Sequence, residues 1–189
     1  MRSRRLVVAV SALAVTLLAG VVQSTTASAA PYCGITWGSL LKSSPEMTVS
    51  PITGARVGRH DCWDRLVIDL ATQPGPGYRV SYADAFYAEG SGQPLPVAGG
   101  AILRVAVQAP AYTLSGQPTV SWRVGDHFVT PQQFSAGGFR TFRDLVYGGS
   151  FEGYTTFGLG VRARLPFRVF KLDGPGEGSR LVIDVAHQW

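Results

Sequence analysis

Ser150 comes nearest to a known catalytic pattern in this chain. It lies in Gly148-Gly149-Ser150-Phe151-Glu152, whereas the nucleophile elbow of serine hydrolases requires glycine two residues after the serine. Gly158-Leu159-Gly160 is only a fragment of a phosphate-binding glycine signature, and no helix is predicted to follow it. Neither stretch therefore predicts catalysis.

The histidines and carboxylates give no stronger indication of an enzyme. His60, His127 and His187 stand far apart without a closely spaced ligand set, so we expect no metal site and no cofactor. A glycosidase needs two carboxylates at a defined separation, which a sequence does not reveal. The carboxylates considered for such a pair are Glu89, Asp126, Asp144 and Glu152. We expect a protein without enzymatic activity, and a hydrolase lacking a recognisable motif is the less favoured alternative.

The first 29 residues have the pattern of an export signal. Met1–Arg5 is basic, Leu6–Val22 is apolar or small, and Ala27-Ser28-Ala29 has the small-x-small pattern of a cleavage site. About 17 apolar residues are few for a membrane span, so we expect a cleavable signal peptide and no membrane attachment of the mature protein. Ser3-Arg4-Arg5 leaves export by the general or the twin-arginine route open. The protein is predicted to be secreted or cell-wall associated.

Cys33 and Cys62 are the only cysteines of the chain. In an exported protein such a pair predicts one disulfide, whose closure would stabilise the fold by about 3.5 kcal/mol. Neither cysteine belongs to a Cys-x-x-Cys or a Cys/His ligand pattern, which disfavours redox or metal chemistry.

Charge excludes one class of partner and suggests another. The whole chain carries +5, but without the basic residues of the signal fourteen basic and twelve acidic residues remain, which leaves +2. This charge is too small for a nucleic-acid-binding footprint. A local excess of arginine nevertheless occurs within residues 140–168, at Arg140, Arg143, Arg162, Arg164 and Arg168. Gathered on one side, these arginines would suit an anionic polymer, and a scattered solvated face is the alternative.

Glycine and proline clusters separate segments that alternate in polarity, which predicts strands joined by turns. One pentapeptide, Arg65–Asp69, recurs letter for letter as Arg180–Asp184. Because side chains alternate between the faces of a strand, its apolar residues should be buried and its Arg and Asp should lie on the opposite face. The predicted buried residues are Leu66, Ile68, Leu181 and Ile183.

Two segments allow two interpretations each. Phe139–Tyr147 spaces Phe142, Leu145 and Val146 as a short helix would, although the rest of the chain favours strands. Phe151–Gly160 contains Thr155 and Thr156 between glycines and is either a recognition loop or a bulged strand.

Several motifs together resemble the AMIN-like domain of exported bacterial proteins. They are Gly58-x-His60-x-x-x-Asp64-Arg65 with the first pentapeptide, Phe151–Gly160, Pro166-Phe167-Arg168-Val169, and the second pentapeptide with Ala186-His187. The resemblance covers residues 31 to 189, and Tyr32-Cys33-Gly34 with Trp37–Leu40 is similar to an N-terminal extension of some members. After the signal peptide predicted at 1–29, it implies an extension at 30–46 with Cys33 and an AMIN-like β domain at 47–189.

The resemblance implies an all-β β-sandwich, here with at most one short helix. AMIN modules localise cell-wall amidases and secretin pores by binding peptidoglycan or envelope partners, so the resemblance implies a non-enzymatic envelope-binding module. We expect it to recognise peptidoglycan or another anionic wall polymer, and docking to an envelope protein is the alternative. The candidate ligand-binding residues are Arg162, Arg164, Arg168, Thr155, Thr156 and His60. The alternative role of His60 is that of a turn histidine that hydrogen-bonds the backbone. The exact ligand and the oligomeric state are left open.

Overall fold

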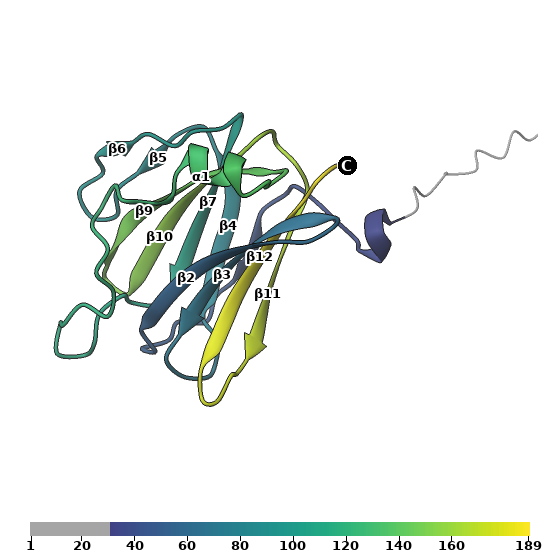
Figure 1. Cartoon of the computed structure of the whole chain (residues 1–189). Helices are drawn as coiled ribbons and strands as arrows, with labels where there is room; N and C mark the ends of the chain where they lie inside the picture. Colours follow the sequence, from purple (N-terminus) through teal and green to yellow (C-terminus); the bar gives the residue numbers. More distant parts are fainter. Residues whose placement is uncertain (1–30) are drawn as a thin grey trace, which may run out of the picture.

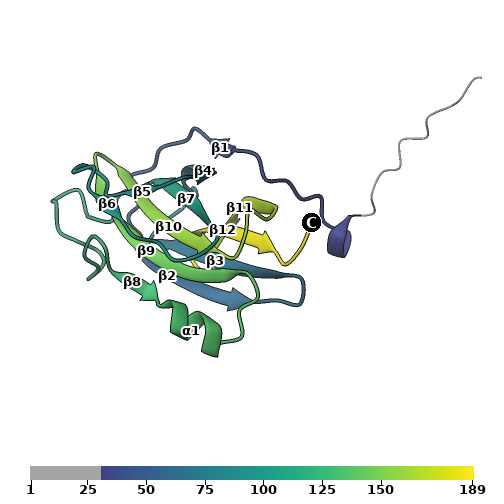
Figure 2. The same ribbon diagram turned by 90° about the horizontal axis from the view of Figure 1, so that it is seen from above.

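Two antiparallel sheets pack face to face in the computed structural model, which describes residues 31–189 (Figures 1 and 2). The larger sheet has the order β1 (Lys42–Ser44), β4 (Gly77–Ala83), β7 (Ala101–Gln108), β10 (Tyr154–Val161), β9 (Phe142–Phe151), β8 (His127–Val129). The smaller sheet has the order β11 (Phe167–Asp173), β12 (Ser179–Ala186), β3 (Trp63–Leu70), β2 (Ile52–Arg59). The all-β prediction is thus confirmed, while the predicted signal peptide at 1–29 lies outside the described residues.

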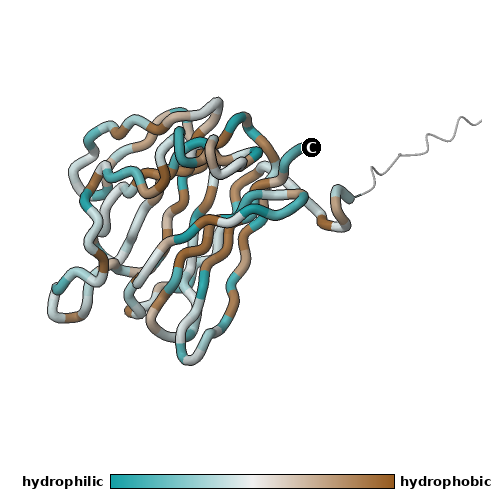
Figure 3. Tube along the Cα trace, in the orientation of Figure 1, coloured by the Kyte–Doolittle hydropathy of each residue, from teal (hydrophilic) through white to brown (hydrophobic). Residues whose placement is uncertain are grey.

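The hydrophobic core fills the space between the two sheets. Leu66 and Ile68 of β3 and Leu181 and Ile183 of β12 are fully buried there, as the alternation predicts. Figure 3 shows hydrophobic residues concentrated along the strands and hydrophilic residues on the β2–β3 turn. No helix among residues 31–189 is long and apolar enough to cross a membrane.

The two copies of the repeated pentapeptide pair with each other. β3 and β12 are antiparallel with Val67 opposite Val182, which places Arg65 opposite Asp184 and Asp69 opposite Arg180. Both carboxylates therefore lie on the outer face of the smaller sheet. Their environments differ, because Asp184 is fully buried whereas the Asp69 side chain is 27% exposed.

Of the two interpretations of Phe139–Tyr147, the short helix is wrong, because Phe142–Phe151 forms β9. A β-bulge between Phe142 and Asp144 inserts one extra residue, so Phe142 and Leu145 both reach the core three residues apart. That spacing resembles a helical period. The only α-helix of residues 31–189 is α1 (Pro131–Ala136), which begins with a capping box between Thr130 and Gln133. In Figure 2, α1 lies at the side where β8 and β2 form sheet edges.

Phe151–Gly160 is a strand hairpin and not a recognition loop. β9 and β10 are joined by a tight turn, and a bulge separates Thr156 from Phe157. Thr155 and Thr156 are fully buried in β10, and the Thr155 hydroxyl donates to Ala109 O at 2.7 Å. These threonines are therefore not available to a ligand at the surface.

Glycines let a small hairpin cover the outer face of the larger sheet. The hairpin pairs β5 (Phe86–Tyr87) with β6 (Pro94–Leu95), and Phe86 is buried against β9 and β10. A Cβ on Gly158 would lie 2.6 Å from the Phe86 ring, and one on Gly148 would lie equally close. Glycine is thus required where this aromatic ring meets the sheet.

The N-terminal extension is tied to the domain in three ways. A disulfide joins Cys33, in the 3-10 turn Tyr32–Gly34, to Cys62 in the β2–β3 turn, as predicted. Gly38 O accepts from the backbone of Phe167 at 2.9 Å, beside the edge strand β11. β1 then adds an edge to the larger sheet by pairing with β4.

Candidate functional site

Four exposed arginines gather at one end of the sandwich, which we call the basic end. They are Arg59, Arg140, Arg162 and Arg164. Arg59 ends β2, Arg140 precedes β9, and the other two follow β10, so each stands where a strand begins or ends. Within residues 31–189, none of these four guanidinium groups forms a salt bridge.

A pocket of about 470 Å³ opens at this end between the β2–β3 turn and the connection from α1 to β9. Arg59, His60 and Asp61 line one side, and Gly138 and Arg140 line the other. We call it the hairpin pocket. A Cβ on Gly138 would lie 2.6 Å from the Arg59 guanidinium, so glycine leaves room for that side chain against the loop.

Asp64 forms the floor of the hairpin pocket and is fully buried. One carboxylate oxygen accepts from the backbone N–H groups of Thr141 and Phe142 at 2.6 and 3.0 Å, which holds the start of β9 against β3. The other oxygen lies 3.1 Å from His187 Nε2. These partners satisfy the buried carboxylate, so its role at the site is to position the surrounding chain.

His187 is almost fully buried behind the pocket. Its Nδ1 lies 3.2 Å from Asp61 O, and its own carbonyl accepts from the Arg162 guanidinium. The Ala186-His187 motif thus links the C-terminal strand to both the β2–β3 turn and the β10–β11 connection.

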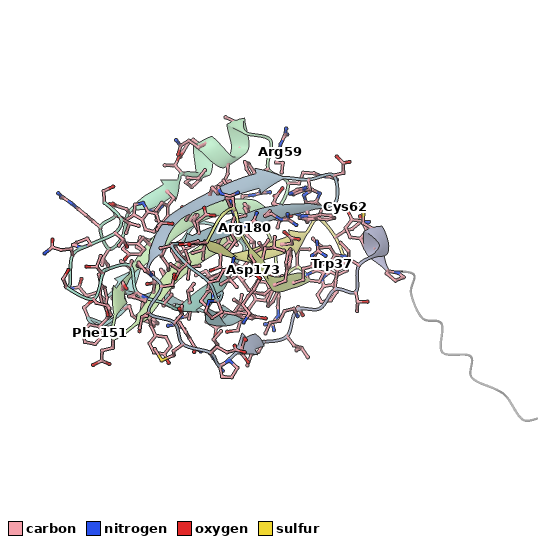
Figure 4. All side chains as sticks on the ribbon, turned by 90° about the horizontal axis from the view of Figure 1, so that it is seen from below. Trp37, Arg59, Cys62, Phe151, Asp173 and Arg180 are labelled. Carbon is pink, nitrogen blue, oxygen red and sulfur yellow. A yellow bond between two sulfur atoms is a disulfide. The ribbon has the colours of Figure 1, made fainter. Side chains whose placement is uncertain are left out.

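His60 is an exposed turn histidine. Its backbone N–H donates to Trp63 O at 2.9 Å, and its ring stacks on the Trp63 ring with centroids 5.1 Å apart. Figure 4 shows Arg59 and Cys62 toward one side of the molecule and Phe151 at the opposite side. His60 lines the hairpin pocket next to Arg59.

A second pocket of about 430 Å³ lies on the other side of the β10–β11 connection. Tyr82 and Asp84, the Gly99-Gly100 backbone and Arg164 line it, and we call it the tyrosine pocket. The Tyr82 hydroxyl donates to Leu165 O at 2.6 Å and accepts from Leu165 N–H at 2.9 Å. Burial raises the pKa of Tyr82 to about 12.

Arg168 is placed away from both pockets. It lies on the outer face of β11, where it and Arg65 both bind the Asp184 carboxylate. Its guanidinium also lies 5.6 Å from the Trp37 ring and 5.1 Å from the Trp63 ring. This arginine therefore joins the N-terminal extension to the domain, which is a structural role.

The predicted site residues thus separate into groups. Arg162, Arg164 and His60 meet at the basic end, whereas Arg168 is held by Asp184 and both threonines are interior. Arg143 is half-buried, and its guanidinium donates to Phe142 O at 2.7 Å and to Arg140 O at 3.3 Å. The sequence-based site did not include Arg59 or Tyr82. Arg59 stands inside the Gly58-x-His60 motif, which could have indicated it, and the aromatic ring of Tyr82 is of a type that can stack on a sugar.

The motifs that meet around the hairpin pocket come from opposite ends of the domain, with His60 and Asp64 near its start and His187 near its end. The family model of the AMIN-like domain matches residues 50–187. The chain belongs to the AMIN-like family. Comparison with curated proteins and with solved structures gave no match. Membership of this AMIN-like family suggests a cell-wall-associated binding module, and the Cys33–Cys62 disulfide fits an exported protein.

The basic end can bind anions by charge and by hydrogen bonding. Each guanidinium offers a planar set of donors suited to carboxylate or phosphate. Three arginines and three carboxylates line the two pockets, but Asp64 is fully buried and bonded to His187 and to two backbone N–H groups, so Asp61 and Asp84 are the exposed carboxylates. No group of three or more His, Cys, Asp or Glu side chains gathers as metal ligands in residues 31–189.

Proposed function

We propose that this AMIN-like protein is a non-enzymatic, exported module that binds peptidoglycan or another anionic cell-wall polymer through its basic end. The observation that carries the proposal is the convergence of Arg59, Arg140, Arg162 and Arg164, all exposed and free of salt bridges among the described residues. Arginines left without a carboxylate partner are available to an external anion.

The expected binding strength follows from the number of contacts. An arginine–anion contact at an exposed site contributes on the order of 1 kcal/mol, so three such contacts correspond to roughly a hundredfold in affinity. Because exposed charges are screened by salt, the binding should weaken steeply as ionic strength rises.

The test is sedimentation of the purified protein with insoluble cell wall. Replacing Arg59, Arg140 and Arg164 together by Ala should weaken cosedimentation roughly a hundredfold and leave the thermal midpoint nearly unchanged. Arg168 is kept, because it binds buried Asp184 and its loss would destabilise the fold.

The matched control replaces Arg79 and Arg123 by Ala. Both are exposed, and neither lines the hairpin or the tyrosine pocket. The control should bind wall like the parent. If the triple variant folds and also binds like the parent, the basic end is not the wall-binding site. Soluble product released from the wall would instead indicate a hydrolase.

An apolar groove favours docking to an envelope protein as a second candidate function. It lies beside the β9–β10 turn, has a volume of about 490 Å³, and is lined by Met47, Val49, Pro110 and Leu114. Leu114 is 90% exposed at the tip of a loop held by the Thr113–Gln117 backbone hydrogen bond. Glu152, the chain neighbour of groove residue Gly153, is exposed and forms no salt bridge among residues 31–189, whereas Glu46 already pairs with Lys171 at 3.6 Å, so the groove fits an apolar segment with one basic residue on the Glu152 side.

Site-specific photo-crosslinking from position 114 in intact cells tests this second candidate. A crosslinker there should capture one identified envelope protein, and Val49→Asp should abolish the adduct because it places a charge in the groove. A crosslinker at exposed Thr53 of β2 is the control position. Equal adducts from both positions would exclude specific docking in the groove.

A further inference from the structure

The segment between β10 and β11 connects the two pockets of the basic end. Arg162 N–H donates to Thr141 O at 2.9 Å, and its guanidinium reaches His187 O at the back of the hairpin pocket. Two residues later, the Arg164 guanidinium lies 5.1 Å from the Tyr82 ring in the tyrosine pocket. Arg164 thus lines the tyrosine pocket, whereas Arg162 contacts His187, a lining residue of the hairpin pocket.

The connection is held in place from both sides. Gly100 N–H donates to Val161 O at 2.8 Å, and a Cβ on Gly100 would collide with Arg162 O. Both bonds between Tyr82 and Leu165 fix the far end of the segment. The two pockets therefore keep a constant separation, which is the condition for binding two linked groups at once.

The Arg162–Arg164 segment that lies between the two pockets is short. The Cα atoms of Arg162 and Arg164 are at most about 7 Å apart, the reach of two extended residues. The long side chains diverge from there, one toward His187 and the other over Tyr82. Charged groups on consecutive or near-consecutive units of a linear polymer can reach both sides.

We propose that the basic end is a two-pocket site that recognises a linear polymer with a repeated anionic group, and that both pockets must be filled for tight binding. This inference rests on the proposed function and adds its ligand class. Arg59 and Arg140 receive one anionic group in the hairpin pocket, and Arg164 receives another in the tyrosine pocket. A carboxylate on each sugar and a phosphate in each unit share this chemistry.

Isothermal titration of the mature protein with two length series tests the inference. One series contains oligogalacturonates of one to eight sugars, and the other contains linear phosphates of one to eight units. As the oligomer lengthens, the dissociation constant in one series should fall in a step at the length that first fills both pockets. This step should be at least tenfold larger than the added number of charged groups accounts for. The series that shows this step identifies carboxylate or phosphate as the recognised group. If neither series shows this step, the inference is wrong.

Arginine variants test whether the step in the dissociation constant depends on both pockets. Arg164→Ala, or Arg59→Ala with Arg140→Ala, should each remove the step and reduce the affinity for long oligomers to nearly that for short ones. Asp84→Asn should strengthen binding of the longest oligomer several-fold, because it removes a negative charge from the tyrosine pocket. A tighter variant cannot result from misfolding. Length dependence that survives Arg164→Ala contradicts the two-pocket site.

The two proposals can fail separately. If wall sedimentation depends on the basic end while no length step occurs, the two-pocket inference is wrong and the proposed function stands. If neither wall binding nor oligomer binding responds to the arginine variants, both are wrong. The Arg79 and Arg123 variants serve as the control in both assays.

Discussion

Asp69 and Asp184 occupy the same position of an identical pentapeptide, yet the fold uses them differently. Asp184 is fully buried between Arg65 and Arg168, whereas Asp69 binds Arg56, whose side chain is 54% exposed. Removing one partner of a buried ion pair leaves charges without compensation, while an exposed pair contributes little. The cost of losing each carboxylate should therefore differ greatly.

Asp184→Ala should lower the free energy of unfolding by about 3–5 kcal/mol, and Asp69→Ala by less than about 1 kcal/mol. Urea denaturation of both variants measures the difference, with Asp69→Ala as the matched control. Equal effects would show that burial of Asp184 does not govern its contribution.

Burial raises the pKa of three tyrosines. The pKa of Tyr82 and of Tyr147 rises from 10 to about 12, and that of Tyr78 shifts in the same direction. Since the raised values belong to the folded state, Tyr82 and Tyr147 contribute stability that is complete below pH 10 and is lost as pH rises toward 12. Absorbance titration of the folded protein should show these two phenols ionising last of the seven, and Tyr82→Phe should remove one of them. Uniform ionisation near pH 10 would contradict their burial.

At the scale of elements, glycine decides how the β5–β6 hairpin covers the larger sheet. A Cβ on Gly158 would lie 2.6 Å from the fully buried Phe86 ring, whereas a Cβ on Gly58 of β2 would meet nothing within 4 Å. Gly158→Ala should therefore cost about 1–3 kcal/mol of stability, and Gly58→Ala should be nearly neutral. Thermal denaturation measures the stability of both variants. If Gly158→Ala is as mild as Gly58→Ala, the β5–β6 hairpin can move away from the sheet without cost.

The disulfide connects two elements that share few other contacts near the basic end. Replacing Cys33 and Cys62 by Ser should lower the free energy of unfolding by about 3.5 kcal/mol, because the unfolded chain gains freedom. Alkylation of the native parent without reduction, followed by mass measurement, should label neither cysteine. Two labels would refute the bond.

At the scale of the whole molecule, the family match begins at residue 50, after the extension that carries Cys33 and β1. We expect a chain of residues 47–189 with Cys62→Ser to fold cooperatively and to bind wall through the basic end. Its stability should be lower, because the disulfide and the contact of Trp37 with Arg168 are lost. Circular dichroism on heating and wall sedimentation check this boundary, and a chain without a cooperative transition would show that the extension belongs to the domain.

Local sequence determined the features that depend on alternation and on pairs of residues. The period of two in Arg65–Asp69 and Arg180–Asp184 identified the buried leucines and isoleucines, and two cysteines in a chain predicted to be exported identified the disulfide. The same rule failed at Phe142 and Leu145, because the bulge between them shifts the alternation by one residue, and a bulge follows from pairing with β10.

Only the tertiary structure decided what covers each face and which distant residues meet. Alternation places Asp69 and Asp184 on one face of the smaller sheet. Asp184 is buried because the neighbouring strand β11 adds Arg168 and the extension adds the Trp37 ring beside that arginine. Likewise, Arg59 and Arg140 are 81 positions apart and meet because two sheets end at the same side of the sandwich. A sequence records which residues follow one another along a strand, whereas a binding site forms where the ends of many strands come together.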